Sequence, residues 1–375
     1  MKKTVLISCV LLTFIIGIYY YSNNNGFVLQ DEVDNQIINT NALTMMYETE
    51  YQSGEYQVSS DSVWPQEGYT FNEELSKCEN GSTLIWNDES KKVLLQANTS
   101  DNCYVYFDVM PNITNFAQYI TDVVYTGTDG DNGLYYHDGQ GTYTNANQEA
   151  GDNSYRYAGA NPNNYVCFGS DEVSCPADNL YRIVGVFDNK VKLIKNISYG
   201  ESRWGGSVST IAWSNSLLNK DVLNGSYLNS FDYNWQNSIS TVIWYVGGFS
   251  QYYNPPKVIY GYELGENRVD TTYESKVGLM YVSDYGYAAS PDYWLTELFD
   301  YNKSVSANWL YSGVSEWTIS NARGAGYILG INSYGIVSDD HHNGTELNYR
   351  PTFYLNSDVE LDSGNGTEEN PFRIV

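Results

Sequence analysis

Residues 4–21 form an apolar segment without a charged side chain, directly after Lys2 and Lys3. A helix of about 20 apolar residues is long enough to span the hydrocarbon core of a bilayer. The two lysines favour a cytoplasmic N-terminus, and Tyr19–Tyr21 lie where interfacial aromatic residues are expected. We therefore expect residues 1–25 to be a signal anchor, a single-pass transmembrane helix in the cell membrane, with the bulk of the chain extracellular.

Two other interpretations of this segment are weaker. A cleaved secretory signal would need small residues after the apolar core, and YYYSNNN offers no A-x-A-like site. The sequence LISC, which ends at Cys9, faintly resembles a lipobox, but the apolar run continues past it. The uncleaved anchor is the interpretation that we favour.

The remaining cysteines are Cys78, Cys103, Cys167 and Cys175. Other connectivities are allowed, but the simplest one pairs Cys78 with Cys103 and Cys167 with Cys175, because each pair is local in the sequence. A metal site would need short C-x-x-C hooks or nearby histidines, and the sequence has neither. Disulfides fit an oxidising, extracellular compartment, where each would stabilise the fold by about 2 to 4 kcal/mol.

Composition favours sheets over helices. The chain has 375 residues, of which 42% are hydrophobic and 15% aromatic, enough for real cores. Its 37 tyrosines, set against only 17% charged residues, are typical of strands joined by polar loops. The formal charge of -26 repels phosphate backbones, so we expect no nucleic-acid partner. We predict an α+β fold rich in antiparallel strands.

The N-terminal third divides into a stalk and a small domain. Residues 26–63 are polar with few periodic apolar positions, and we interpret them as a stalk with a short helix around residues 41–50. Residues 64–110 contain three or four candidate strands, separated by Asn-Gly and Asn-Asp turns, and they enclose Cys78 and Cys103. We predict a small all-β module linked by a disulfide, which a unit of this size needs.

Residues 115–375 are expected to form one domain. Its cleanest hairpin is YRIVGVFDNKVKLIKN, with strands over 181–187 and 191–194 around the turn Asp188-Asn189. The other predicted elements are helices over 116–124 and 214–228, strands over 277–282, 317–319, 327–331 and 335–337, and a terminal β meander that starts at Thr352.

Five segments of this domain carry a family resemblance: YRYAGANPNNYVCFG, the hairpin above, GLMYVSDYGYA, NWLYSGVSEWTIS and RPTFYLNSDVELDSGNGTEENPFRI. Together they resemble the C-terminal domain of a family of uncharacterised Gram-positive bacterial surface proteins. Those domains are similar to C-type-lectin-like folds and, distantly, to formylglycine-generating enzymes. The likeness spans most of residues 115–375, and residues 64–110 resemble a module that often precedes this domain. It implies a lectin-like fold on a cell surface.

The sequence favours binding over catalysis. It contains no nucleophile elbow, P-loop or dinucleotide-binding fingerprint. The formylglycine-generating relatives use a cysteine pair late in their domain, whereas this chain has no cysteine after Cys175. The doublet His341-His342 is interpreted as part of an exposed acidic loop. We expect that the protein is not an enzyme.

Calcium is the one cofactor for which the sequence offers candidate ligands. The segment GTDGDNG contains Asp129, Asp131 and Asn132 at a spacing that begins like a calcium loop, but no bidentate glutamate follows. An exposed, turn-rich loop explains the same residues more simply. Calcium binding is therefore the weaker of the two expectations.

The segment WYVGGFSQYYNPP has loop character, and we expect its rings, those of Tyr245, Phe249, Tyr252 and Tyr253, to contact a sugar or a protein. Most tryptophans of the large domain are expected in its core. Our hypothesis is a membrane-anchored, extracellular surface protein of the adhesion type whose head recognises a glycan or protein ligand. The alternatives are a purely structural surface component and, less favoured, a carbohydrate-active hydrolase with an Asp/Glu pair.

Overall fold

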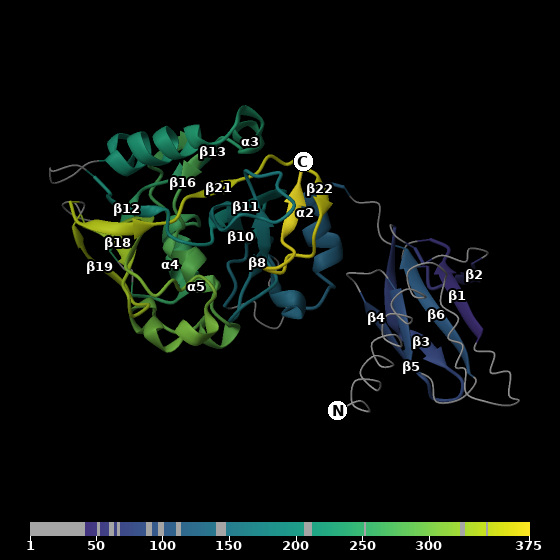
Figure 1. The fold of residues 1–375 in the computed structure, drawn as a ribbon. Coiled ribbons are helices and arrows are strands. Elements are labelled where there is room, and N and C mark those ends of the chain that lie inside the picture. The colour runs from purple at the N-terminus through teal and green to yellow at the C-terminus, as the bar shows by residue number, and fades with distance from the viewer. Residues whose placement is uncertain are drawn as a thin grey trace, which may run out of the picture. The chain divides into compact units, whose positions relative to one another are not determined.

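The computed structural model describes residues 42–50, 53–59, 64–65, 68–87, 92–96, 101–109, 114–139, 148–205, 212–250, 253–322, 327–342 and 344–375. They fall into two compact units, one within residues 1–112 and one within residues 113–375 (Figure 1). The described residues are mostly β-sheet with few helices. None of their helices is long and apolar enough to cross a membrane, and the predicted anchor, residues 1–25, lies outside them.

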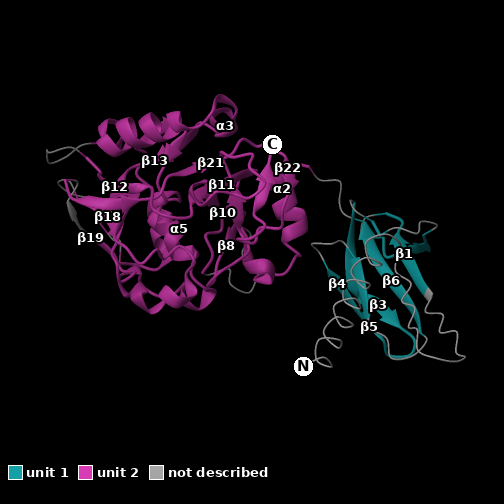
Figure 2. Cartoon of the chain, viewed as in Figure 1, with its two compact units in different colours: residues 1–112 teal, residues 113–375 magenta. Residues whose placement is uncertain are grey.

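Unit 1, drawn in teal in Figure 2, is a four-stranded sheet with a separate hairpin. The sheet has the order β2-β1-β6-β3, and β4 pairs with β5. The strands are β1 (Ala42–Glu48), β2 (Tyr56–Val58), β3 (Tyr69–Cys78), β4 (Thr83–Asn87), β5 (Lys92–Gln96) and β6 (Asn102–Val109). Three buried residues, Val93, Val105 and Phe107, form the centre of its core, so both the sheet and the hairpin contribute to it.

Strand β1 corrects our interpretation of the stalk. We predicted a short helix around residues 41–50, but Ala42–Glu48 form a strand that pairs in parallel with β6. Leu43, Met45 and Tyr47 pack against the core of unit 1. These apolar residues alternate with period two, which is the pattern of a half-buried strand and not of a helix. The residues therefore belong to the sheet of the β module.

Both predicted disulfides are confirmed. Cys78 and Cys103 lie directly opposite each other on the antiparallel strands β3 and β6 of unit 1, and the bond joins them there. Cys167 and Cys175 are bonded in unit 2, where the bond closes the loop after β9.

Unit 2 contains a nine-stranded sheet whose main path is β16-β21-β11-β10-β9-β23-β22, with β7 and β8 paired beside β10. Its strands are β7 (Leu134–His137), β8 (Ser154–Tyr157), β9 (Tyr165–Cys167), β10 (Leu180–Phe187), β11 (Lys190–Lys195), β16 (Val277–Gly278), β21 (Thr352–Tyr354), β22 (Leu361–Ser363) and β23 (Phe372–Ile374). The strands β10 and β11 form the predicted hairpin, with Asp188 and Asn189 at positive φ in its turn.

A six-stranded sheet and a short ribbon complete the strands of unit 2. The sheet follows the order β12-β20-β17-β18-β19, with β14 beside β17. These strands are β12 (Gly200–Arg203), β14 (Gly248–Phe249), β17 (Glu316–Ala322), β18 (Tyr327–Ile331), β19 (Val337–His342) and β20 (Glu346–Tyr349), and the ribbon is β13 (Val242–Tyr245) with β15 (Thr272–Ser275). The sequence predicted β17 and β18 well, but His341 and His342 lie in a strand and not in a loop.

The helices of unit 2 are short. They are α2 (Phe116–Tyr119), α3 (Tyr233–Ser238), α4 (Pro256–Glu263) and α5 (Val282–Tyr287), the π-helical segments Ile120–Val124 and Leu218–Tyr227, and the 3-10 turns Asp131–Gly133, Ala177–Asn179, Trp213–Asn215, Leu228–Ser230, Pro291–Tyr293, Leu298–Lys303 and Val305–Ala307. Both predicted helical regions, 116–124 and 214–228, are helical in the structure.

Two predicted elements differ from the structure. The strand predicted over 277–282 ends at Gly278, and α5 begins at Val282 because Tyr281 and Asp284 form a capping box. The predicted terminal meander does not exist as one ribbon. Strand β21 pairs with β11 and β16, whereas β23 pairs with β22 and runs parallel to β9. The last strands therefore add to both sides of the large sheet.

The tryptophans of unit 2 confirm the predicted aromatic core. Five of them are among the largest fully buried side chains: Trp204, Trp213, Trp244, Trp294 and Trp317. Their indole nitrogens mostly donate to backbone carbonyls, as Trp244 does to Ser275 and Trp294 to Ala289. Burial of such rings is a large part of the hydrophobic stabilisation of the unit.

Gly185 lies where β10 changes register, and a side chain there is predicted to be costly. A Cβ atom at this position would lie 2.2 Å from the backbone oxygen of Tyr155. We expect Gly185→Ala to lower the free energy of unfolding by about 1 to 3 kcal/mol, as overpacking does. The measurement is urea unfolding followed by tryptophan fluorescence. Gly200→Ala is the control, because the nearest atom there is 3.8 Å away; equal stability of the two variants would contradict the prediction.

Candidate functional site

A pocket of about 350 Å³ in unit 2, which we call the tyrosine pocket, is the best candidate for a binding site. Its volume lies within the range of small-ligand pockets. Three tyrosines, one phenylalanine, one lysine and two serines are among its lining residues: Tyr181, Tyr199, Tyr227, Phe231, Lys195, Ser198 and Ser230. The pocket thus combines aromatic faces with hydroxyl groups and a cationic group.

The hairpin register explains part of this arrangement. Tyr181 on β10 lies opposite Lys195 on β11, and residues opposite each other on antiparallel strands share one face of the sheet. The π-helical segment Leu218–Tyr227 ends at Tyr227, whose hydroxyl lies 2.6 Å from that of Tyr181. Tyr199 packs edge-on against Tyr227 with the ring centroids 4.9 Å apart. Tyr199 is 41% exposed, so part of its ring is open to a ligand.

Lys195 is a buried cation in this pocket. It is 3% exposed, and its Nζ donates to the backbone oxygen of Asp178. Within the part of the chain that the structure describes, no carboxylate oxygen forms an ion pair with it. Burial lowers the pKa of Lys195, and the charge of Asp178 opposes this shift. A lysine ammonium has three donors, so this one can also serve a ligand oxygen.

Among the described residues of the predicted aromatic loop, one ring is buried and another is exposed. Phe249 is 4% exposed in β14 and stacks on Tyr262, so its ring is a core ring. Tyr253 is 47% exposed, and the Arg268 guanidinium lies over the ring of Tyr245. Tyr252 lies outside the described residues. Because Phe249 is buried, its ring is not available to contact a ligand as we predicted.

The predicted calcium ligands form hydrogen bonds within their own loop. The Asp129 carboxylate accepts hydrogen bonds from the Tyr125 hydroxyl at 3.0 Å and from a backbone N–H at 2.8 Å. Asp131 accepts one from Thr126 at 2.7 Å, and the Asn132 side chain donates to a backbone oxygen. These contacts close the turn, as the simpler sequence interpretation expects. Calcium binding at this loop stays a prediction.

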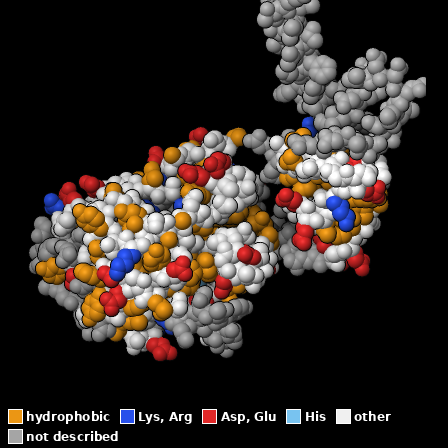
Figure 3. All heavy atoms as spheres, turned by 90° about the horizontal axis from the view of Figure 1, so that it is seen from below, with side chains coloured by type: hydrophobic (Ala, Val, Ile, Leu, Met, Phe, Trp, Pro, Cys, Tyr) orange, Lys and Arg blue, Asp and Glu red, His pale blue; other side chains and the backbone are white. Residues whose placement is uncertain are grey.

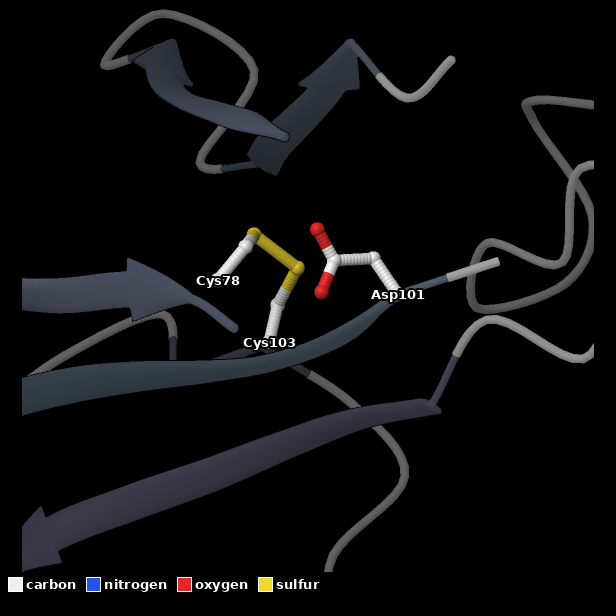
Figure 4. A group of neighbouring side chains, drawn as sticks. All are labelled: Cys78, Asp101 and Cys103. Carbon is white, nitrogen blue, oxygen red and sulfur yellow. A yellow bond between two sulfur atoms is a disulfide. The ribbon is translucent and has the colours of Figure 1, made fainter. Parts of the chain in front are cut away.

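A cluster of Cys78, Asp101 and Cys103 resembles a metal site only in composition. Figure 4 shows the two sulfur atoms bonded to each other, with the Asp101 carboxylate beside them. Disulfide sulfurs are not thiolates, which are the form that binds metal. The carboxylate of Asp101 instead accepts the backbone N–H groups of Asn80 and Ser82. The cluster is therefore a cross-link beside a capped turn.

Three buried charges and one partly exposed carboxylate form a second notable group, which we call the charge cluster: Arg156, Lys192 and Asp284 are buried, and the Asp152 side chain is 19% exposed. Lys192 Nζ lies 2.6 Å from Asp284 Oδ2, and Arg156 Nη2 lies 2.6 Å from Asp152 Oδ2. Burial alone would raise the pKa of Asp152, but the charge of Arg156 lowers it to about 2. The cluster is balanced in charge, which is the condition for burying ions.

Glu263 at the end of α4 lies beside the charge cluster. Its carboxylate accepts the backbone N–H groups of Val282 and Ser283 and the hydroxyl of Ser320. Burial nevertheless raises the pKa of Glu263 to about 7, and hydrogen bonds reduce the shift. This group therefore holds a proton over much of the acidic range.

Glu149 and His137 are further buried titratable groups. Glu149 is 1% exposed, and burial together with the charge of Asp129 raises its pKa to about 7. His137 Nδ1 accepts the backbone N–H of Ala150 at 2.9 Å, so its Nε2 carries the hydrogen. Burial lowers the pKa of His137 well below its ordinary value, and the ring is neutral. No group of three metal ligands includes these side chains among the described residues.

The surface of unit 2 is consistent with the acidic composition. The face shown in Figure 3 carries scattered apolar and acidic side chains with few basic ones. This face therefore offers no basic patch that would attract a polyanion.

Comparison of the chain with protein-family models, with curated proteins and with solved structures finds no match. The tyrosine pocket and the charge cluster were not predicted from the sequence. Arg156 and Lys192 could have indicated the cluster, because each is a charged residue within a strand of mostly buried residues.

Glu149 predicts a pH dependence of stability. Between pH 4.5 and about 7 the folded protein keeps the Glu149 proton while the unfolded chain loses it. The contribution of the proton to stability is thus present below pH 4.5 and is lost as the pH rises through about 7. We expect the free energy of unfolding of the wild type, relative to Glu149→Gln, to fall over this interval.

Chemical unfolding at a series of pH values measures this difference. Glu201→Gln, which changes an exposed carboxyl group, is the control. A constant difference between wild type and Glu149→Gln across the interval would show that burial does not hold the proton on Glu149.

Proposed function

We propose that unit 2 is the ligand-binding head of a membrane-anchored, extracellular surface protein, and that the tyrosine pocket binds a saccharide. The observation that carries this proposal is the pocket itself, where an exposed tyrosine ring, serine hydroxyls and a buried ammonium line one cavity. Sugar rings pack their C–H faces on aromatic rings, and their hydroxyl groups need polar partners at the edge. The tyrosine pocket offers both kinds of contact.

The location rests on three features of the chain. Residues 4–21 are apolar and follow two lysines, both units carry a disulfide, and the large domain resembles surface proteins with lectin-like heads. Together they support a cell-surface binding or adhesion role.

Two other functions are less well supported. A purely structural surface component would need no pocket of this kind. A glycoside hydrolase would need two carboxyl groups across the bound sugar, and Asp178 is the only acidic residue among the described residues that line the pocket. Binding is therefore the function that we favour.

Tyr199→Ala tests the proposal. The substitution removes the exposed ring and leaves the other lining residues in place, so we expect saccharide affinity to fall at least about tenfold, or roughly 1.4 kcal/mol. A glycan array with the full chain first identifies bound saccharides, and titration of the best one then compares the variants. Tyr334→Ala is the matched control, because Tyr334 is 73% exposed and does not line the pocket.

The outcomes separate the alternatives. Equal affinity of Tyr199→Ala and Tyr334→Ala would place binding elsewhere, and the absence of any bound saccharide would favour the structural component. Repeating the titration with a chelator tests the calcium prediction at Asp129, because a required ion would make binding sensitive to its removal. Release of free sugar during the titration would favour the hydrolase.

A further inference from the structure

Lys192 and Asp284 form an unusually close pair inside unit 2. Lys192 lies on β11 and Asp284 on α5, and Nζ is 2.6 Å from Oδ2 with both side chains at most 1% exposed. Four aromatic rings surround the Nζ atom at 4.8 to 5.8 Å: Phe187, Trp244, Tyr281 and Tyr354. Water is therefore largely excluded from the contact.

The environment of Lys192 favours its neutral form. Burial lowers the pKa of Lys192, and the charge of Arg156 lowers it further against the attraction of Asp284. A desolvated lysine that loses its proton is a nucleophile. Arg156 and Asp152 form their own ion pair, with Nη2 2.6 Å from Oδ2. If Lys192 and Asp284 both lose their charges, the two charges that remain in the charge cluster still cancel.

Glu263 supplies a proton donor at the same place. It binds the backbone N–H groups of Val282 and Ser283, the two residues that precede Asp284. Its charge acts on both members of the pair, which places it near them. A protonated carboxylic acid beside a carboxyl group and an amine is the arrangement that general acid catalysis of their condensation needs.

Two unpartnered atoms complete the arrangement. Arg156 Nη1 and Asp284 Oδ1 have no hydrogen-bond partner among the described residues, and they lie 3.7 Å apart. The Asp284 oxygen next to Lys192 is Oδ2. If Oδ2 is lost when Lys192 bonds to Asp284, Oδ1 remains on Cγ as the carbonyl oxygen. Arg156 then faces the remaining carbonyl oxygen and can donate to it.

We propose that Lys192 and Asp284 are joined by an intramolecular amide bond that forms spontaneously when unit 2 folds. The lone pair of neutral Nζ attacks Cγ of the Asp284 carboxyl group, and a C–N bond forms. The Cγ–Oδ2 bond breaks, and Oδ2 leaves as water, with one proton from Nζ and one from the Glu263 carboxyl group. One water is lost for each bond, and no oxidant or cosubstrate is needed. The bond links β11 to α5 and does not depend on ligand binding.

Peptide mass spectrometry of the full wild-type chain tests the proposal. The purified protein is denatured, reduced and digested, and the peptides that contain Lys192 and Asp284 are analysed. We expect one branched peptide whose mass is the sum of the two minus one water, with no cleavage by trypsin at Lys192. Recovery of the two peptides as separate linear species would overturn the proposal and leave a buried ion pair.

The same digest contains a matched control. Lys303 Nζ lies 2.7 Å from Asp300 Oδ2, almost the same separation, but both side chains are at least half exposed. This pair stays hydrated. Asp284, Asp300 and Lys303 lie on one tryptic peptide, residues 277–303, so we expect cleavage after Lys303 and fragment ions that place the single water loss at Asp284 and not between Asp300 and Lys303. A water loss at both pairs would show that sample handling dehydrates carboxyl groups, and would overturn the assignment of the bond to the buried site.

Two variants test the roles of the residues. Lys192→Arg keeps the charge but cannot lose its proton, so the branched peptide should disappear. Glu263→Gln keeps the shape of the acid without its proton, and we expect the branched fraction to fall at least about tenfold if acid catalysis contributes as it commonly does. Lys195→Arg changes another buried lysine and should leave the bond intact. A full yield of branched peptide in Glu263→Gln would remove Glu263 from the proposed step.

Discussion

The burial of charge at the centre of unit 2 is the constraint on which the rest of that unit depends. Asp152, Arg156, Lys192 and Asp284 come from the segment before β8, from β8, from β11 and from α5. Removal of Asp152 leaves Arg156 without the opposite charge that lies 2.6 Å away, and an uncompensated buried charge is among the most costly defects in a protein interior. The cluster therefore fixes how the helix α5 lies against the large sheet.

The tyrosines of unit 2 are the second group of residues that stabilises its interior. Inside unit 2 several of their hydroxyls have hydrogen-bond partners, as Tyr285 does at a backbone oxygen and Tyr181 at Tyr227, and rings such as Tyr199 and Tyr227 pack edge to face. Tyr199 continues this packing to the surface, where part of its ring is exposed. The proposed binding site is thus lined by a partly exposed ring, that of Tyr199, which packs on the buried ring of Tyr227. The contacts that stabilise the core therefore also hold the site in place.

The two proposals concern different parts of β11. Lys195 at its end lines the tyrosine pocket, whereas Lys192 lies in the charge cluster. The strand therefore connects a rigid interior to a candidate binding surface. An amide bond at Lys192 would resist local opening of β11.

The sequence by itself determined the local elements and the covalent pairs. Alternating apolar residues and an Asp-Asn turn were sufficient for the β10–β11 hairpin, and short separations were sufficient for both disulfides, because these features depend on neighbours in the chain. The predicted stalk helix failed at Ala42–Glu48, where pairing with the distant β6 forms a strand. Only the tertiary structure decided that Phe249 is buried, that Tyr199 opens a pocket, and that Lys192 meets Asp284. Those outcomes depend on contacts between residues far apart in the sequence, which no local pattern encodes.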